Sequence, residues 1–541
     1  MAIVAVGAGA QEPRGAGPDA RTPPAGAIRF GVGFTWERNI EQYLGSGAGS
    51  LRELGARFSL DTLGSSVFAA LGPVQAATAT MAGMPGFRAS LGRSTVHARN
   101  MFETTPLAAE IGVTSHFSVG VMVPLVTTTS RVDVVVNPHG NEATVGLNPA
   151  YFAPSVISAN GELLAQFDSA AALLSRRITT CGAQPSATGC AGVNANIAAA
   201  QALIQQSSAF AAAMATLYGG RDGSRGALFV PVAGTAAQAA IGARIQGFKA
   251  QYAALGGAIS GAPPVGAPGP VTAAGFQAIL TDSAYGIIAS PLGSVVRRGV
   301  GNIDVSAQFT WHDSYTRSAS PGSMVKRFWW RSAIAGTYRL GTGAPPKPED
   351  LIPMGTGDHQ RDVEVRSITD LGIGTTASVT TVLRHTMQAE GTLRMRIAAS
   401  PTDPFPEAFR TALVTRDPGD ETAVDVYPRW NLSRAMSVAG HYGYRSRSAD
   451  AYRGSVTGTD PAGATVTADA SALDEGTAAH EHRVGAVVAY STVSAWNAGK
   501  ARWPIELSIS HFQTISASGG TVPKLAYDEV QIRWFWHPFG R

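Results

Sequence analysis

The residues of this sequence with the clearest potential for chemistry are a short His-Glu-His run near the C-terminus. His480 and His482 flank Glu481, and in an extended strand the two imidazoles would share one face while the carboxylate points to the other. Zinc sites use three or four protein ligands, and the sequence offers no further ligands at a matching spacing. The helical H-E-x-x-H pattern is also absent. We therefore expect no metal site.

The two cysteines, Cys181 and Cys190, could form a covalent link. The run that they enclose, CGAQPSATGC, contains Gly, Pro and Ser, which let a chain fold back and bring the sulfurs together. We expect a disulfide and hence an oxidising compartment. Two reduced surface thiols in a cytosolic protein are the alternative.

Other catalytic patterns do not emerge from the residues. Gly31-Val32-Gly33 and the other glycine pairs do not lie between a strand and a helix, as a nucleotide-binding loop requires. There is no nucleophile elbow around a serine. A lipase or protease barrel stays open as an alternative, because a triad carried by strands needs no local motif. We expect no catalytic residues, no cofactor and no enzymatic activity.

The N-terminus resembles the end of an export signal. Residues 2–10 are small and apolar, and Ala8-Gly9-Ala10 before Gln11 has the A-x-A form of a signal-peptidase site. The apolar run is short and lacks a basic start. We interpret residues 1–10 as the remnant of a signal peptide, which agrees with the expected disulfide in pointing to export.

Composition then narrows the class of protein. Only 15% of the 541 residues are charged, against about 25% in ordinary soluble domains. The 45% apolar content argues against a disordered chain. The net charge of +4 is spread along the chain without a basic stripe, so we expect no nucleic-acid partner. The long uncharged stretches 226–243 and 250–281 contain prolines and many small residues, and neither predicts a membrane-spanning helix.

Strict alternation of apolar and polar residues is the strongest pattern in the chain. Ile28, Phe30, Val32, Phe34 and Trp36 alternate with Arg29, Gly31, Gly33, Thr35 and Glu37. The same alternation recurs at 302–312 and 529–536. Period two indicates strands that have one apolar and one polar face. A soluble β-sandwich would show it too.

Three further features favour a membrane barrel over a sandwich. The polar faces carry Arg, Glu, Asp and Gln, as in a water-filled lumen, and the apolar faces end in aromatic residues, as in membrane girdles. Connections alternate between a few residues and dozens, notably from Glu41 to Pro85 and from Asn137 to Val300. The expected export and disulfide fit a bacterial outer membrane. A sheet in lipid must also close, because no backbone edge can stay unpaired there.

The sequence therefore predicts an all-β fold: a transmembrane antiparallel up-and-down β-barrel of about 12 strands. The expected strands are 28–40, 90–113, 117–136, 301–313, 327–341, 361–370, 375–386, 421–432, 435–447, 480–493, 503–516 and 524–537. An even count places both chain ends on the periplasmic side. The stretch 388–420 could add a hairpin, so fourteen strands stay open.

Several phrases of the sequence resemble a known family. Pro106 to Leu125, Gly301 to Trp311 and Gly355 to Val365 are similar to strand and turn phrases of the fatty-acid and aromatic-hydrocarbon uptake superfamily of outer-membrane barrels, including its meta-pathway phenol-degradation type. The resemblance implies transport of hydrophobic or aromatic compounds. The chain departs from this pattern in ending on Phe539-Gly540-Arg541 and in its insertion from Ser155 to Arg297.

The insertion is Ala-rich and shows helical spacing. Residues 161–179, 192–218 and 236–256 predict helices, with apolar stripes such as Leu203, Phe210, Met214 and Leu217. We expect a cap above the pore or a plug inside it, or else a stabilising loop that binds nothing. The expected organisation is a signal remnant at 1–10, barrel strands with a long first outer loop at 11–154, the helical insertion with its disulfide loop at 155–297, and the other strands at 298–541.

The expected function is that of an outer-membrane channel or uptake protein for small solutes, hydrophobic or aromatic if the resemblance holds. Its partners would be outer-membrane lipid and the solute, and the protein would be a monomer. The alternative is a surface interaction protein whose barrel is an anchor and whose insertion binds a partner. Six inward positions are the candidate lumen-lining residues: Asn302, Asp304, Gln308, Glu506, Gln531 and Arg533.

Overall fold

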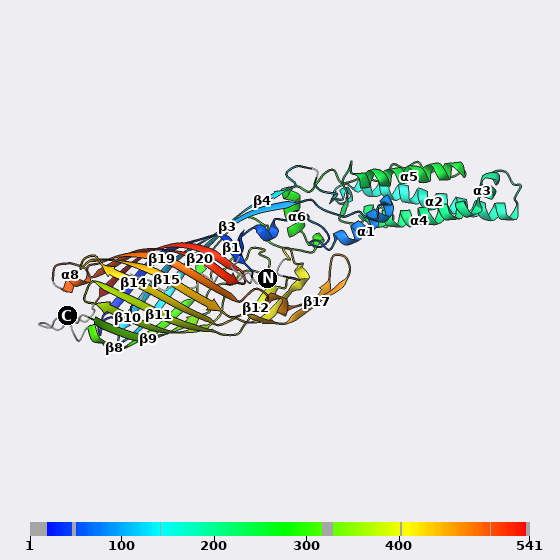
Figure 1. Cartoon of the computed structure of the whole chain (residues 1–541). Helices are drawn as coiled ribbons and strands as arrows, with labels where there is room; N and C mark the ends of the chain where they lie inside the picture. The colour runs from blue at the N-terminus through cyan, green and yellow to red at the C-terminus, as the bar shows by residue number, and fades with distance from the viewer. Residues whose placement is uncertain are drawn as a thin grey trace.

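A computed structural model of the chain describes residues 19–45, 50–140, 142–315, 328–400, 403–497 and 499–536. The expected signal remnant, the proposed cleavage site before Gln11 and the C-terminal Phe539-Gly540-Arg541 lie outside the described residues. A long cylinder of tilted strands fills one end of the molecule, and a bundle of helices projects from the other (Figure 1).

Twelve antiparallel strands form the cylinder. In hydrogen-bonding order they run β1, β21, β20, β19, β15, β14, β11, β10, β9, β8, β4 and β3, and β3 pairs with β1, which closes the sheet into a barrel. Their bounds are β1 Ile28–Leu44, β3 Ser94–Gly112, β4 Phe117–Val136, β8 Ile303–Asp313, β9 Phe328–Leu340, β10 Asp362–Ile373, β11 Ala377–Gln388, β14 Glu421–Asn431, β15 Met436–Arg447, β19 Ala479–Ser491, β20 Ile505–Gly519 and β21 Val522–Trp536. The expected barrel and its twelve strands are confirmed.

The fourteen-strand alternative is not adopted. Strands β12 (Gly391–Arg396) and β13 (Thr411–Asp417) form the hairpin that the pattern at 388–420 allowed. They pair with β16 (Ala451–Arg453) in a separate three-stranded sheet. The smaller strands β2 (Ser50–Glu53) and β7 (Val295–Val300) extend the barrel sheet at β1 and β4, whereas β5 with β6 (Val145–Leu147, Phe229–Pro231) and β17 with β18 (Ser455–Thr459, Thr465–Asp469) form separate pairs.

The faces of the strands follow the alternation of the sequence. Phe34 and Trp36 of β1 are exposed on the outside, whereas Thr35 and Glu37 are buried inside. On β8, Val305, Phe309 and Trp311 point outward and are about half exposed, while Asp304 is 5% exposed. An apolar exterior around a polar interior is the arrangement of membrane barrels and the reverse of a soluble core.

The apolar core of the molecule lies beyond the barrel, among the helices. The helices are α1 Leu71–Ala82, α2 Pro154–Ala183, α3 Ala191–Ala195, α4 Ile197–Tyr218, α5 Ala236–Ala254, α6 Ala273–Thr281 and α8 Val493–Asn497. Phe167, Phe210 and Phe248 pack together with ring centroids 5.3–5.9 Å apart. None of the described helices combines the length and the apolar character that a membrane crossing demands.

Local signals in the sequence explain where these helices begin. Asn196, Thr235 and Thr272 accept hydrogen bonds from backbone N–H groups in the first turns of α4, α5 and α6, which satisfies donors that have no partner within the helix. Pro154 opens α2 at a position where the missing N–H costs nothing. The expected disulfide between Cys181 and Cys190 is present and joins the end of α2 to the start of α3.

Candidate functional site

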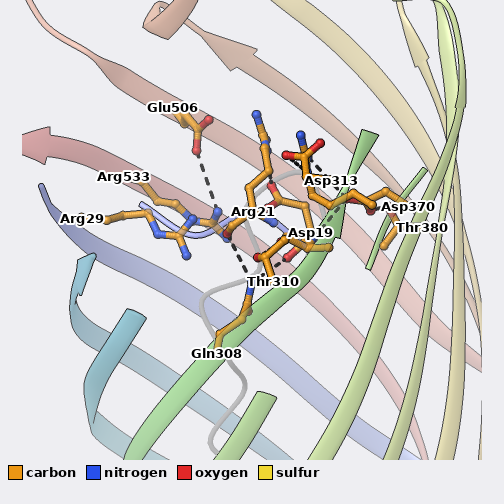
Figure 2. Close-up of polar contacts among 12 residues, drawn as sticks. Asp19, Arg21, Arg29, Gln308, Thr310, Asp313, Asp370, Thr380, Glu506 and Arg533 are labelled. Atoms are coloured by element: carbon orange, nitrogen blue, oxygen red, sulfur yellow. Dashed lines mark hydrogen bonds and ion pairs between the residues drawn. The ribbon is translucent and has the colours of Figure 1, made fainter. Parts of the chain in front are cut away.

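The lumen near the short turns is crossed by the three residues Asp19, Ala20 and Arg21, which we call the strap (Figure 2). Ala20 is completely buried against the inward residues Ala333, Ala335, Ile368 and Val382. This packing needs side chains no larger than alanine on β9 where the strap passes. The strap precedes β1 in the chain and carries no periodic pattern, so the sequence alone gave no sign of it.

Hydrogen bonds fasten the strap to two strands on one wall of the barrel. Thr310 of β8 donates to the backbone carbonyl of Ala20 at 2.6 Å, and the side-chain amide of Gln308 donates to the carbonyls of Asp19 and Arg21 at 3.5 and 3.3 Å. On the same wall, the backbone N–H of Ala20 donates to Asp370 of β10 at 3.1 Å. Since β9 lies between β8 and β10 in the sheet, the strap is fastened along one wall of the barrel, over β9.

Charge holds the strap in its conformation. The Arg21 guanidinium donates to Asp19 at 2.7 and 3.2 Å. Burial alone would raise the pKa of Asp19, but Arg21, Arg29 and Arg429 outweigh it and hold that pKa far below its ordinary value. The Asp19 carboxylate in turn raises the pKa of Arg21.

Two cavities meet at the strap. One of about 130 Å³ is lined by β1, β3, β4 and β8–β10 residues such as Gly31, Gly120 and Thr337. The other, of about 770 Å³, opens among the short turns at 374–376 and 433–435. Asp19 and Arg533 line both cavities, so the strap and this arginine form the constriction between them.

Most of the residues expected to line the lumen border these cavities. Asp304 and Gln308 border the smaller one, Glu506 and Gln531 the larger, and Arg533 both. Asn302 lies elsewhere, at the junction of β7 and β8. There its amide donates to Asp358 at 2.7 Å and its carbonyl accepts from Gly343 at 2.9 Å, so it fixes the loop between β9 and β10.

Ion pairs cover the remaining lumen wall. Arg339 joins Asp304 at 2.9 Å and Asp362 at 3.5 Å, and Arg331 joins Asp313 at 2.9 Å. Arg533 approaches Glu506 at 3.8 Å (Figure 2). Sequence alternation predicted Asp304, Glu506 and Arg533 as inward, but Arg339, Arg331, Asp313 and Asp362 were not named, because these pairs depend on a strand register that could not be read from the sequence.

A layer of aromatic rings interrupts the polar lumen. Tyr427, His441, Phe512 and Tyr527 come from β14, β15, β20 and β21, and successive ring centroids lie 4.6, 4.9 and 4.8 Å apart. Asp425 approaches His441 at 2.8 Å. Gly485 makes room for this layer, because a β-carbon there would overlap the Phe512 ring. All four side chains are buried, at 0–5% exposure, and none of them lines either cavity.

The His-Glu-His run divides between the two faces of β19. His480 and His482 lie outside, next to the hydroxyls of Tyr444 and Tyr442 at 3.2 and 2.8 Å. Glu481 lies inside and pairs with Arg483 at 2.6 Å. Among the described residues, no group of three or more His, Cys, Asp or Glu side chains could hold a metal ion.

A further cavity, of about 120 Å³, lies at the end of the barrel that faces the helices. Its apolar lining includes Pro345, Pro353, Leu351 and Met395, and its polar lining includes Arg57 and the Tyr452 ring. Four separate segments of the chain contribute these residues. No sequence pattern links them, so this cavity could not be predicted.

Solved outer-membrane proteins are similar to this chain over most of its length, at low sequence identity. No family model matches the sequence, and no curated protein matches it. Solved structures of similar fold include an outer membrane channel from Pseudomonas putida F1, with 7% identity, a TM-score of 0.41, and coverage of 96% of this chain and 98% of that one. They also include the toluene transporter TodX of P. putida (10%, TM-score 0.23, 95% and 89%) and a FadL homologue of Pseudomonas aeruginosa (6%, 0.26, 94% and 90%). In all three cases the identity is 10% or less and the TM-score is below 0.5.

Proposed function

We propose that this chain is an outer-membrane channel that takes up small hydrophobic or aromatic solutes. The observation that carries the proposal is the constricted lumen, in which cavities of about 130 and 770 Å³ meet at the strap. An anchor needs no internal space, whereas a channel needs space together with an element that limits passage.

The lining of the lumen supports a solute that combines an apolar body with a polar edge. Tyr315, Trp329 and Tyr490 stand among the charged residues of the larger cavity. Aromatic side chains stack on flat apolar molecules, while arginine and carboxylate groups bind polar substituents. The proline-lined cavity beside the helices would receive such a solute first.

The proposed placement follows from the outer surface. The long connections and helices α1 to α6 lie at one end of the barrel, and the short turns lie at the other together with the short helix α8 (Figure 1). Long loops face outward in bacterial barrels, so the ends of β1 and β21 at Ile28 and Trp536, which pair directly, would be periplasmic. We propose that the barrel works as a monomer, because it closes on itself without a second chain.

Planar-bilayer recording tests the proposal. The purified full chain should give steady conductance steps, and the triple variant Asp19→Gly/Ala20→Gly/Arg21→Gly, whose strap cannot hold its contacts, should give larger ones. Proteoliposomes should take up an aromatic alcohol faster than a sugar of similar size. A bilayer that stays sealed with both proteins would contradict a channel.

A second function is favoured by the position of the helices. Helices α2, α4 and α5 project away from the barrel instead of covering its mouth (Figure 1), which is where a surface protein would present a binding site. In that case the barrel is an anchor, and sealed bilayers together with binding of the intact protein to a surface polymer or a neighbouring cell would support it.

A further inference from the structure

Along β3 and β4 the outward side chains change from apolar near the short turns, through Glu103, Thr127 and Thr129, to basic. Near the short turns the outward side chains are Ile111 and Leu107 on β3 and Val121 and Leu125 on β4, each between 36% and 45% exposed. A tilted membrane strand needs about 9–11 residues to cross the hydrocarbon. Counted from Ile111, that length ends near Met101, and the next outward residue is Arg99.

Arg99 of β3 and Arg131 of β4 are direct partners across the sheet. Both side chains are exposed on the outer face, and the β-carbons of such partners lie about 4.5–5.5 Å apart. Like charges in this position destabilise a strand pair. Within the described part of the chain, neither guanidinium has an ion-pair partner.

Two further arginines stand beside this pair on the same outward face. Arg298 of β7 is exposed opposite Thr127, and Arg38 of β1 is exposed opposite Met101. Arg38 makes a long, exposed ion pair with Asp528 at 3.6 Å, which is worth little. We call Arg38, Arg99, Arg131 and Arg298 the arginine face.

The carboxylates near the arginine face do not neutralise its central row. A row is one pair of outward residues that lie directly opposite each other on β3 and β4. Glu103, opposite Thr127, lies two rows from Arg99. Asp133 lies one row beyond Arg131, opposite His97, which contacts Glu53 at 3.0 Å. The row of Arg99 and Arg131 therefore holds two positive charges and no negative one.

We propose that the arginine face binds a phosphate group in the headgroup of an outer-leaflet lipid. This inference rests on the outer-membrane placement proposed above. At the edge of the apolar band the side chains stand at the height of lipid headgroups. Two neighbouring guanidinium groups can each form two parallel hydrogen bonds with a phosphate, which arginine does better than lysine. The phosphate would also remove the repulsion between Arg99 and Arg131.

Native mass spectrometry of the full chain in detergent tests this inference. The probes are lipid A with two phosphates and the same lipid without phosphate. The wild type should bind the phosphorylated form at least tenfold more tightly, and Arg99→Gln/Arg131→Gln should lose that preference. The matched control, Arg176→Gln/Arg225→Gln, removes two exposed arginines from the helical region and should keep it.

Three outcomes would overturn the inference. These are equal binding of both lipids by the wild type, an unchanged preference in Arg99→Gln/Arg131→Gln, or displacement of the lipid by inorganic phosphate at millimolar concentration, which would indicate a simple anion site. The comparison of the two lipids on the wild type holds even if the double variant fails to fold. If the protein conducts ions but binds both lipids equally, this inference is wrong and the channel proposal stands. If it does not conduct but prefers the phosphorylated lipid, the channel proposal is wrong and this inference stands.

Discussion

The hydroxyl of Thr310 donates a 2.6 Å hydrogen bond to the backbone carbonyl of Ala20, two residues that are 290 positions apart in the chain. This bond fixes the strap against β8, while Asp370 holds the same residue from β10. The strap's part in the constriction, beside Arg533 of the wall, therefore depends on a few hydrogen bonds to a short segment. Such a segment can be loosened without unfolding the strands.

Loosening the strap should open the lumen. Thr310→Val with Gln308→Leu removes the side-chain donors that β8 offers to the strap. Each neutral hydrogen bond contributes about 0.5–1.5 kcal/mol, so the open fraction should rise about tenfold. Single-channel recording should show longer or larger openings. Ser332→Ala is the control, because Ser332 bonds to Thr369 of the wall and not to the strap; an equal effect there would point to general loosening of the barrel.

The larger cavity should make the channel select anions. Five arginines line it, Arg21, Arg331, Arg429, Arg434 and Arg533, against the three carboxylates Asp19, Asp370 and Glu506. A lumen lined by an excess of one charge concentrates ions of the opposite sign. In a potassium chloride gradient the reversal potential should therefore favour chloride.

Neutralising one of these arginines should weaken that selectivity. Arg434→Gln changes a residue at a short turn, and we expect the ratio of chloride to potassium permeability to fall by about twofold. Arg176→Gln on α2 serves as the control, since it lies outside the lumen. Cation selectivity in the wild type would show that the ions do not pass through this cavity.

The barrel was predictable from sequence because its signal is local and repeated. Each strand from Ile28–Leu44 to Val522–Trp536 carries the alternation along its own length, and period two is imposed by backbone geometry whatever the partner strand. The helices around Phe210 and Phe248 were predictable for the same reason, since their 3.6-residue spacing is local.

The constriction was not predictable, because it depends on contacts between distant residues. Asp19, Ala20 and Arg21 have no periodicity, and their partners Thr310 and Asp370 come from strands that follow hundreds of residues later. Inward polar positions such as Asp304 could be named from parity alone. Their pairing with Arg339 required the register of β8 against β9.

The aromatic layer should tolerate no added volume at Gly485. A β-carbon at this residue would overlap the ring of Phe512, whereas one at Gly336 of β9 would meet nothing within 4 Å. Overpacking costs about 1–3 kcal/mol. Gly485→Ala should lower the urea concentration at the midpoint of unfolding in micelles, and Gly336→Ala should leave this midpoint nearly unchanged. Unfolding is measured by the heat-dependent shift in gel mobility. Equal midpoints would show that the ring can move aside.

A charged residue on the outward face of the barrel should lower the unfolding free energy by an amount that depends on its depth in the membrane. Ile334 lies in the middle of β9 and is 53% exposed, a position that contacts lipid if the barrel spans a membrane. Arginine on the lipid face near the bilayer midplane costs about 2–4 kcal/mol, so Ile334→Arg should lower the unfolding free energy in phospholipid vesicles by that amount, while Ile334→Leu should change it little. The same substitution at a position exposed to water would not lower the unfolding free energy by a comparable amount. If Ile334→Arg were as stable as Ile334→Leu in vesicles, the apolar exterior would not face hydrocarbon, and the membrane assignment on which the channel depends would be wrong.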